Sequence, residues 1–180
     1  MLEEKRMKTQ IKMGSDTFAQ FEKANEEYSG KFQDSGLPLP PSRKVAIVTC
    51  MDARIDPAKS LGIELGQCHI IRNAGGRTSE ALRSLVISQQ LLGTRDIVVI
   101  HHTDCGMLTF SNDMLNDHLK SHLQLTALPQ IHDFLPFSNL EKSVEEDVVF
   151  LRTNELILKE TKLRGYIYDV NSGKLHVVSS

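Results

Sequence analysis

Three side chains that commonly bind metals lie in two short stretches of the sequence: Cys50, His102 and Cys105. Thiolate and imidazole ligands suit Zn²⁺, and three protein ligands with a fourth position left open are typical of catalytic zinc sites. The pattern His-x-x-Cys is weak by itself, because a buried cysteine is more often a packing residue than a ligand. On residue types alone, a zinc site and a simple core role both stay open.

Two charged residues close behind Cys50 favour the catalytic interpretation. Asp52 and Arg54 follow this cysteine by two and four positions. A carboxylate beside a metal-bound water can accept its hydrogen bond, and an arginine can hold that carboxylate in a bidentate pair and keep it off the metal. The alternative is a turn-forming aspartate beside a solvated arginine. We predict that Asp52 and Arg54 form the catalytic pair if Cys50 binds metal.

The residues between these positions predict alternating strands and helices. The continuous apolar run at 45–48 and the segment DIVVI at 96–100 are typical of strands buried on both faces. Helical periodicity and capping residues indicate helices, and a turn at 171–173 indicates a hairpin. The expected helices are 15–30, a short one from 56, 80–92 with Thr78 or Ser79 as cap, 107–123, and 143 to about 159; the other expected strands are 69–71, 166–170 and 175–178.

This alternation predicts an α/β fold: a mostly parallel central sheet of order 2-1-3-4 with an antiparallel edge strand, flanked by helices. In that order the first and third strands are neighbours. Cys50 and His102, each at the end of one of these strands, are then expected side by side at the carboxyl edge, where such sheets bind ligands. Cys105 would join them from the following turn.

Composition limits the classes of partner. The 180 residues are 40% hydrophobic and 24% charged, which predicts one domain over 1–180 with an N-terminal helical arm at about 15–33. The net charge of -2 favours neither nucleic acid nor an anionic membrane as partner. No apolar run approaches the roughly 20 residues of a membrane span, and no secretory signal is recognised, so a cytoplasmic protein is expected. An odd, low cysteine count argues against a disulfide scaffold.

Three segments in this order resemble the β-class carbonic anhydrases: CMDAR at 50–54, RNAGG at 72–76 and HTDCGM at 102–107. The resemblance covers roughly residues 44–108. The short chain and the HTDCGM segment are similar to the compact, archaeal-like branch. RNAGGR at 72–77 and the doubled His101-His102 resemble a side branch that includes carbonyl sulfide hydrolases. A substrate-site glutamine that plant-like members carry ahead of the first zinc cysteine has no clear counterpart here.

The resemblance implies one Zn²⁺ per chain, held by Cys50, His102 and Cys105, with Asp52 and Arg54 as the paired dyad. It also implies a homodimer or homotetramer in which the N-terminal helix reaches across to the partner subunit. In some members the aspartate moves onto the zinc and closes the site.

The expected function is that of a zinc enzyme that adds zinc-bound hydroxide to a small heterocumulene. Carbon dioxide would give bicarbonate, and carbonyl sulfide would give hydrogen sulfide and carbon dioxide. The substrate pocket is expected at Gly75, Gly76 and Gly106, where glycine lets the backbone approach closely, although the paired glycines are equally suited to a simple turn. A catalytically silent family member that acts as a sensor or assembly partner is the alternative, and the intact Asp52 and Arg54 speak against it.

Other reactive residues have no clear assignment. A redox or nucleotide-binding protein is disfavoured because there is no Cys-x-x-Cys pair and no phosphate-binding glycine fingerprint. Cys68 is expected to be a packed thiol, and Asp104 either orients its loop or forms a local turn. Candidates for moving a proton to solvent, by titration range alone, are His101, His118, His122 and His132; each also suits a surface or packing role.

Overall fold

The computed structural model of the chain describes residues 16–127 and 133–179. Its contacts divide the chain into two units, residues 1–37 and 38–180. The first contains helix α2, Thr17–Ser29. Asp16 caps its beginning, where the side-chain carboxylate accepts the backbone N–H of Phe18 at 3.0 Å, and Gly30 is its C-cap. The helix expected at 15–30 is thus confirmed over its described part. The single domain over 1–180 stays a prediction.

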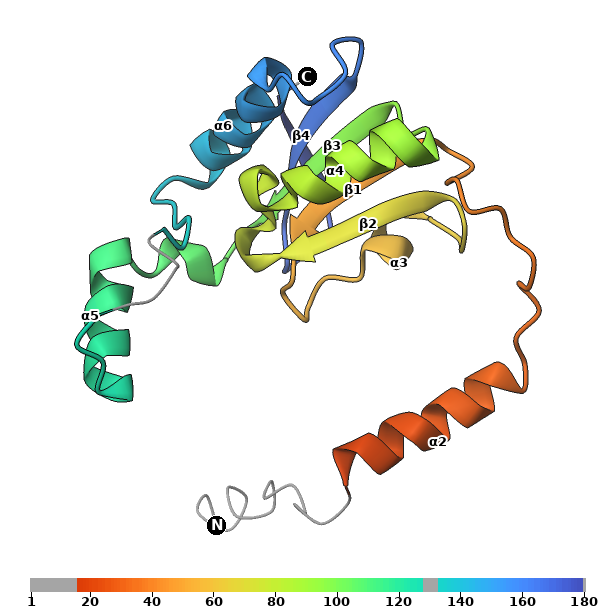
Figure 1. Ribbon diagram of the computed structural model, residues 1–180, viewed down its shortest axis with the longest axis horizontal. Helices are drawn as coiled ribbons and strands as arrows, with labels where there is room; N and C mark the ends of the chain where they lie inside the picture. The colour runs from red at the N-terminus through yellow and green to blue at the C-terminus, as the bar shows by residue number, and fades with distance from the viewer. Residues whose placement is uncertain (1–15, 128–132, 180) are drawn as a thin grey trace. The chain divides into compact units, whose positions relative to one another are not determined.

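The second unit is built on a five-stranded sheet of order β2-β1-β3-β4-β5 (Figure 1). The first four strands of that order are parallel and β5 is antiparallel to β4, so the predicted fold class and strand order are confirmed. Because β1 lies between β2 and β3, the ends of β1 and β3 are neighbours. The strands are β1 Val45–Cys50, β2 Cys68–Asn73, β3 Asp96–His102, β4 Lys162–Tyr168 and β5 Leu175–Ser179.

Two long helices cover one face of this sheet (Figure 1). Fully buried side chains such as Val48, Val99 and Leu85 pack between the strands and the helices, and each contributes about 1.5–3 kcal/mol through burial. The helices of this unit are α3 Pro57–Leu61, α4 Thr78–Leu92, α5 Asn112–Leu123 and α6 Leu140–Thr153, with 3₁₀ turns η1 Ala74–Gly76 and η2 Gly106–Leu108; α4 and α6 are the two that cover the sheet.

Helix α6 lies very close to β4 because position 165 is glycine. A Cβ atom built on Gly165 would lie 2.5 Å from Cγ1 of Val144 and 3.1 Å from Cγ2 of Val148. Any larger residue would therefore push the helix away from the strand. This close approach matters for the site, since α6 contacts both β3 and β4.

Two expected helices have different bounds. The helix expected over 107–123 is replaced by the turn η2 followed by α5, because Ser111 interrupts the chain and accepts the N–H of Met114 at 3.3 Å as an N-cap. The helix expected from 143 begins earlier, where Asn139 accepts the N–H of Lys142 at 2.9 Å. It ends at Thr153 rather than near 159, since Asn154 leaves the helical region with ψ of 126°.

The start of α4 and the extent of β4 also differ from expectation. Helix α4 begins at Thr78, and neither expected residue caps it: Arg77 is the N-cap residue, and the Thr78 hydroxyl donates to the carbonyl of Asp147 at 3.2 Å. Strand β4 begins at 162 rather than 166, because it pairs with β3 along its whole length, from Asp96 opposite Lys162 to His102 opposite Tyr168.

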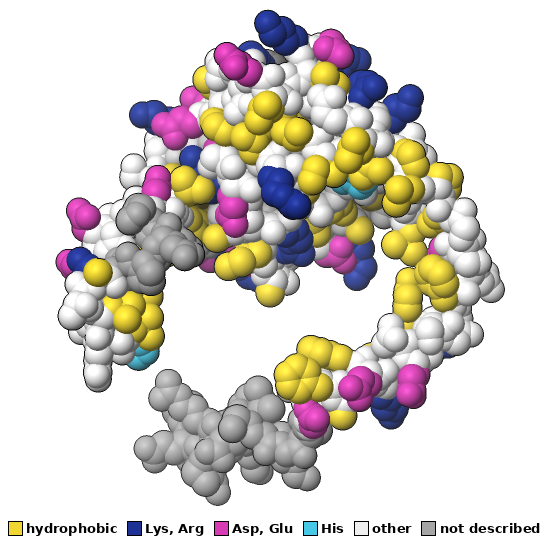
Figure 2. Space-filling view, in the orientation of Figure 1, with side chains coloured by type: hydrophobic (Ala, Val, Ile, Leu, Met, Phe, Trp, Pro, Cys, Tyr) yellow, Lys and Arg dark blue, Asp and Glu magenta, His cyan; other side chains and the backbone are white. Residues whose placement is uncertain are grey.

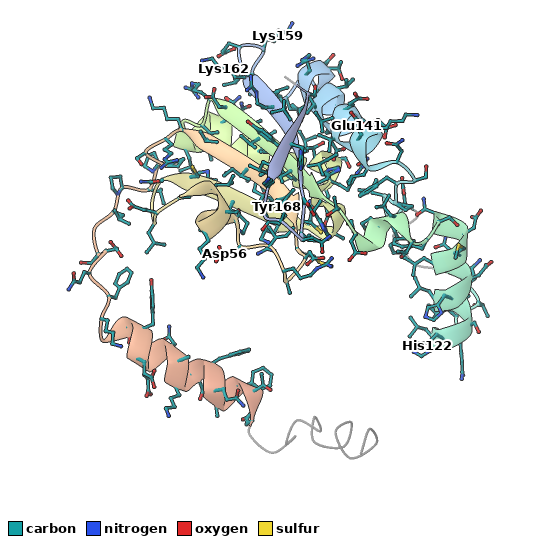
Figure 3. The ribbon with its side chains drawn as sticks, turned by 180° about the vertical axis from the view of Figure 1, so that it is seen from behind. Asp56, His122, Glu141, Lys159, Lys162 and Tyr168 are labelled. Carbon is teal, nitrogen blue, oxygen red and sulfur yellow. The ribbon has the colours of Figure 1, made fainter. Side chains whose placement is uncertain are left out.

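Figure 3 shows the chain from behind, turned by 180° from Figure 1. The second face of the sheet carries exposed apolar side chains. Ile71 packs against the α4 side, so its neighbour Ile70 points to the other face, where Ile70 and Val177 are both exposed. Among the helices that the structure describes, none is long and apolar enough to cross a membrane.

Candidate metal centre and active site

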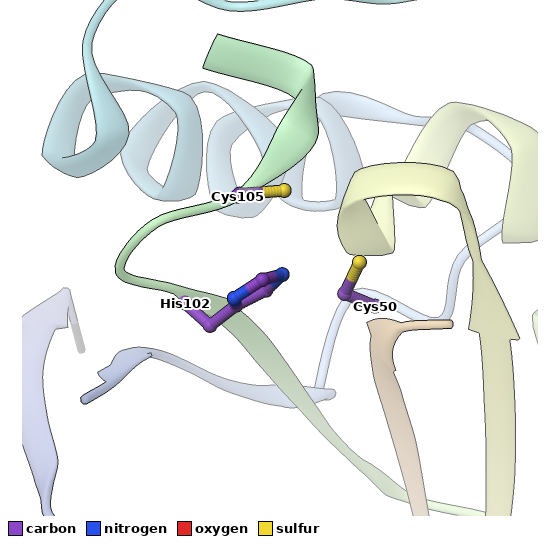
Figure 4. Close-up of side chains that lie close together, drawn as sticks. All are labelled: Cys50, His102 and Cys105. Atoms are coloured by element: carbon purple, nitrogen blue, oxygen red, sulfur yellow. The ribbon is translucent and has the colours of Figure 1, made fainter. Parts of the chain in front are cut away.

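The three predicted metal ligands lie together at the carboxyl edge of the sheet (Figure 4). Cys50 is the last residue of β1, His102 is the last residue of β3, and Cys105 follows in the turn before η2. Their two sulfur atoms and one imidazole nitrogen lie within 4.8 Å of one another, and all three residues are buried. Across residues 16–127 and 133–179 this is the only such group of three. These residues could therefore hold a metal ion.

The orientation of His102 leaves one ring nitrogen ready for a ligand. Its Nδ1 lies 2.9 Å from the carbonyl oxygen of Thr103, and because a carbonyl only accepts, Nδ1 carries the proton and Nε2 holds the lone pair. The buried Nε2 atom has no hydrogen-bond partner among the described residues. Such an unpaired buried atom costs about 1–3 kcal/mol, and a metal ion would recover that cost.

The two thiols are held as a proton-sharing pair. A hydrogen bond from Cys105 lowers the pKa of the Cys50 thiol despite the opposing effect of burial, and the same contact raises the pKa of the Cys105 thiol. Burial is the largest single influence on His102 and lowers its pKa, but Cys50, the Thr103 carbonyl and Asp52 together raise it, so the net direction is upward. This negative, sulfur-rich surrounding suits a soft divalent cation, and the donor set of two sulfurs and one imidazole fits Zn²⁺.

Both carboxylate oxygens of Asp52 accept hydrogen bonds from Arg54. The guanidinium donates from Nε to Oδ1 at 3.0 Å and from Nη2 to Oδ2 at 2.7 Å, and the backbone N–H of Arg54 donates to Oδ1 at 2.9 Å. These bonds hold the pKa of Asp52 well below its usual range, so the carboxylate is ionised near neutral pH. Its Oδ2 lies 3.8 Å from Nε2 of His102.

A second carboxylate completes the hold on Arg54. Its Nη1 donates to Oδ2 of Asp104 at 2.6 Å, and Nη2 donates to the Asp104 carbonyl at 3.0 Å. Asp104 has a left-handed φ of 55° and lies between the two ligands His102 and Cys105 in the sequence. It therefore connects the metal-binding turn to the Asp52–Arg54 pair.

Arg72 fixes the turn that follows β1. It donates from Nε to the carbonyl of Cys50 at 3.0 Å and from Nη2 to the carbonyl of Asp52 at 2.7 Å. Sequence reasoning used Arg72 only as part of the RNAGG segment and missed this role. The position of Arg72 in β2 could have indicated this role. Since β2 lies beside β1, the long arginine side chain reaches the carbonyls of the turn that follows β1.

A mostly apolar pocket of about 350 Å³ opens beside the ligands. Gly75 and Gly106 line it, as expected, whereas Gly76 does not. Gly76 lies under the strand ends instead: its φ is +72°, and a Cβ there would lie 3.0 Å from the backbone of Thr49 and Cys50. The complete lining is Cys50, Met51, Asp52, Ala74, Gly75, Cys105, Gly106, Met107 and Phe110.

The three candidate proton carriers that the structure describes do not line this pocket. His101 is fully buried, with Nδ1 2.7 Å from the Ser143 hydroxyl, a position at odds with proton delivery to solvent. His118 and His122 stack with ring centroids 5.5 Å apart on exposed positions of α5, and neither lines the pocket. His132 lies outside the described residues. Cys68, also free, is not part of the ligand group; burial raises the pKa of its thiol.

Comparison with known proteins agrees with this geometry. The model of the carbonic anhydrase family matches residues 45–175, which include every residue of the candidate centre. The chain belongs to the β-carbonic anhydrase family. Beta-carbonic anhydrase 1 of Mycobacterium tuberculosis is 42% identical over 156 residues, covering 86% of this chain and 93% of that protein.

Two further relatives of this β-carbonic anhydrase bear on substrate and fold. The carbon disulfide hydrolase of an Acidianus species is 32% identical over 161 residues, covering 76% of this chain and 78% of that protein. The crystal structure of carbonic anhydrase from Streptococcus mutans superposes with a TM-score of 0.86 at 48% identity, covering 93% of this chain and 100% of that chain. Homologues with both names make this a family of enzymes.

Proposed function

We propose that this family member is a zinc enzyme that adds water to the central carbon of a small linear heterocumulene, with carbon dioxide as its main substrate and bicarbonate as the product. The observation that carries the proposal is the buried, unpartnered Nε2 of His102 beside the two cysteine sulfurs, with an ionised carboxylate held next to it. A catalytically silent protein would have no need for an ionised carboxylate beside the metal ligands.

Cys50, His102 and Cys105 would hold the metal. Zn²⁺ bound there would supply a water molecule whose pKa is lowered to about 7. Asp52 would accept a hydrogen bond from this water and orient it toward the substrate carbon. Arg54 would keep the carboxylate in place through its bidentate contact. This suits a carboxylate that orients the water molecule and does not itself bind the metal.

The pocket supports a neutral, apolar substrate. The side chains of Met51, Met107 and Phe110 and the backbone at Gly75 and Gly106 surround the space beside the cysteines. A linear molecule without hydrogen-bond donors loses little on entering such a surface, whereas a charged ligand would lose its hydration. A bicarbonate product is therefore expected to leave readily toward solvent.

Carbonyl sulfide is a second candidate substrate. The relation to a carbon disulfide hydrolase and the apolar lining with two methionine side chains both favour it. Water addition to its carbon gives thiocarbonate, which breaks down to carbon dioxide and hydrogen sulfide. The same residues would serve both substrates.

The test measures both reactions on protein of verified zinc content. Stopped-flow carbon dioxide hydration and hydrogen sulfide release from carbonyl sulfide are followed in parallel, with Asp52→Asn as the control. Hydration that depends on Asp52 supports the main proposal. Fast sulfide release with feeble hydration would reverse the order of the two substrates, and no turnover of either by zinc-loaded protein would contradict the enzymatic proposal.

We also propose that the chain forms a homodimer or homotetramer through its N-terminal helix. Apolar side chains gather along α2 (Figure 2), where Phe18, Phe21 and Tyr28 are 73%, 66% and 56% exposed. Since so many exposed aromatic rings on one helix indicate an interaction surface, a second copy is the natural partner. Light scattering of the wild type and of a Phe18→Ser/Phe21→Ser variant tests this, with a smaller particle expected for the variant.

A further inference from the structure

Asp147 on α6 is a buried carboxylate with three partners from other elements. Its Oδ2 accepts the backbone N–H of Thr78 at 3.1 Å and lies 3.1 Å from Nε2 of His101, and its Oδ1 lies 3.3 Å from Nη2 of Arg77. Asp147, Thr78 and His101 are nearly or fully buried. None of the three lines the candidate pocket or belongs to the group of metal ligands.

The partners of Asp147 belong to the two segments that build the site. His101 directly precedes the ligand His102 at the end of β3, and its ring is held at both nitrogens, by Asp147 and by the Ser143 hydroxyl. Arg77 directly follows the glycine turn whose Gly75 lines the pocket. One carboxylate on α6 thus connects the metal-ligand strand with the pocket loop.

Phe137 joins the same two segments from the side. Its ring stacks on His101 with centroids 5.4 Å apart and planes inclined by 14°, and the Arg77 guanidinium lies 5.6 Å from its centroid. Phe137 also packs in the apolar cluster that contains Cys50, Cys105 and Met107. A change in the position of Arg77 or His101 would therefore be passed to the wall of the metal centre.

Stability alone is a poor explanation for this network. Arg77 leaves Nε and Nη1 buried without a hydrogen-bond partner among the described residues, each at a cost of about 1–3 kcal/mol. Replacing a buried ion pair with packed apolar side chains is often neutral or stabilising. A network that accepts such costs beside a reaction centre is better explained by the geometry that it enforces.

We propose that Asp147 is a positioning residue that holds His102 and the loop 75–77 in register, so that the three ligand atoms converge before the metal binds. Ser143 and Arg77 act with it, and none of the three belongs to the group of metal ligands. This inference rests on the proposed function for the identity of the metal, but its test uses metal binding and not turnover.

The test compares Asp147→Asn with Ser88→Ala. Ser88 is a matched control because it is also buried and also joins two side chains, His69 at 2.7 Å and Thr94 at 2.6 Å, but these lie outside the metal centre. Zn²⁺ affinity is measured by chelator competition, and the Co²⁺-substituted proteins are compared by their visible absorption bands. We expect Asp147→Asn to bind Zn²⁺ about tenfold more weakly with altered cobalt bands, and Ser88→Ala to keep both at wild-type values.

Wild-type affinity and cobalt bands in Asp147→Asn would overturn the inference, and so would equal changes in Ser88→Ala. Should Asp147→Asn fail to fold, Ser143→Ala decides, because it removes one bond to His101 and keeps the Asp147–Arg77 ion pair; a few-fold weaker Zn²⁺ affinity is expected, and an unchanged one would refute the inference. Wild-type protein that binds Zn²⁺ without turnover would contradict only the proposed function.

Discussion

Oδ2 of Asp52 lies 3.8 Å from Nε2 of His102, which is close to the separation of two ligands on one tetrahedral zinc ion, roughly 3.5 Å. Asp52 is therefore within reach of a metal held by His102. Arg54 holds the carboxylate away from that position, because it donates hydrogen bonds to both carboxylate oxygens. The balance between orienting a water molecule and binding the metal depends on this guanidinium.

Loss of any one metal ligand should remove metal and activity together. Cys50→Ser and His102→Ala are each expected to retain less than about a tenth of the wild-type zinc, because two remaining ligands no longer form a catalytic site. Cys68→Ser is the matched control, since Cys68 lies outside the ligand group, and it should keep full zinc. Metal content by mass spectrometry checks this, and full zinc in either ligand variant would refute the assignment.

Asp52→Asn should separate metal binding from turnover. The amide keeps the size of the side chain but loses its charge, so it cannot orient a reacting water as an ionised acceptor. We expect unchanged zinc and a fall in kcat of about 10²–10⁴-fold. Asp113→Asn, an exposed carboxylate of α5, should turn over normally, and a near-normal kcat for Asp52→Asn would exclude its proposed role.

Asp104→Asn tests the second hold on Arg54. Asparagine tolerates the left-handed φ of this position, so the substitution removes the charge at Arg54 Nη1 without straining the turn. Because the pair is exposed, stability should change by no more than about 1 kcal/mol, while kcat should fall several-fold as Arg54 loses one of its two anchors. Steady-state kinetics with thermal melts check this; equal kcat would show that Asp52 alone positions Arg54.

The lowered pKa of Asp52 predicts the pH range in which its contact with Arg54 stabilises the fold. A carboxylate whose pKa is lower in the folded state stabilises the protein above its unfolded pKa of about 3.9, and this contribution is lost as the pH falls below it. In metal-free protein, the Tm difference between wild type and Asp52→Asn should shrink as the pH falls below about 4. A difference that shrinks between pH 6 and 5 would contradict the lowered pKa.

Gly165→Ala should destabilise the fold by overpacking. The new methyl group would meet Val144 at 2.5 Å, and such insertions cost about 1–3 kcal/mol. Gly106→Ala is the control for stability, because no atom lies within 4 Å of a Cβ there. Urea unfolding of both variants measures the two free energies, and equal values would show that α6 moves away from β4 without cost.

The sequence predicted the sheet well because its central strands are continuous apolar runs between turn residues. The beginning of β4 was expected too late because lysine and glycine are depleted in strands, although Leu163 and Gly165 are buried under α6. Helix bounds near 111 and 139 were misjudged because Ser111 and Asn139 are caps whose effect depends on the turn before them.

The candidate ligands could be predicted because each lies in a short motif at or just beyond the end of a strand. Asp147 could not be found by residue type, since it stands beside Glu145 and Glu146 in an acidic run. A signal existed nevertheless: Asp147 falls at helical spacing among Val144, Val148 and Leu151, which are all buried. A charged residue within a buried stripe needs partners from other elements, and only the folded chain shows which ones.

Cys50 and His102 end two neighbouring strands and are offset by one position in the pairing register, so their separation follows from the strand spacing of about 4.8 Å and the rise of about 3.3 Å per residue. The sheet backbone therefore sets the distance between two of the metal ligands before any metal binds. A zinc finger differs, because its metal is part of its folding free energy; here we expect an ion that can be removed and replaced while the sheet stays folded.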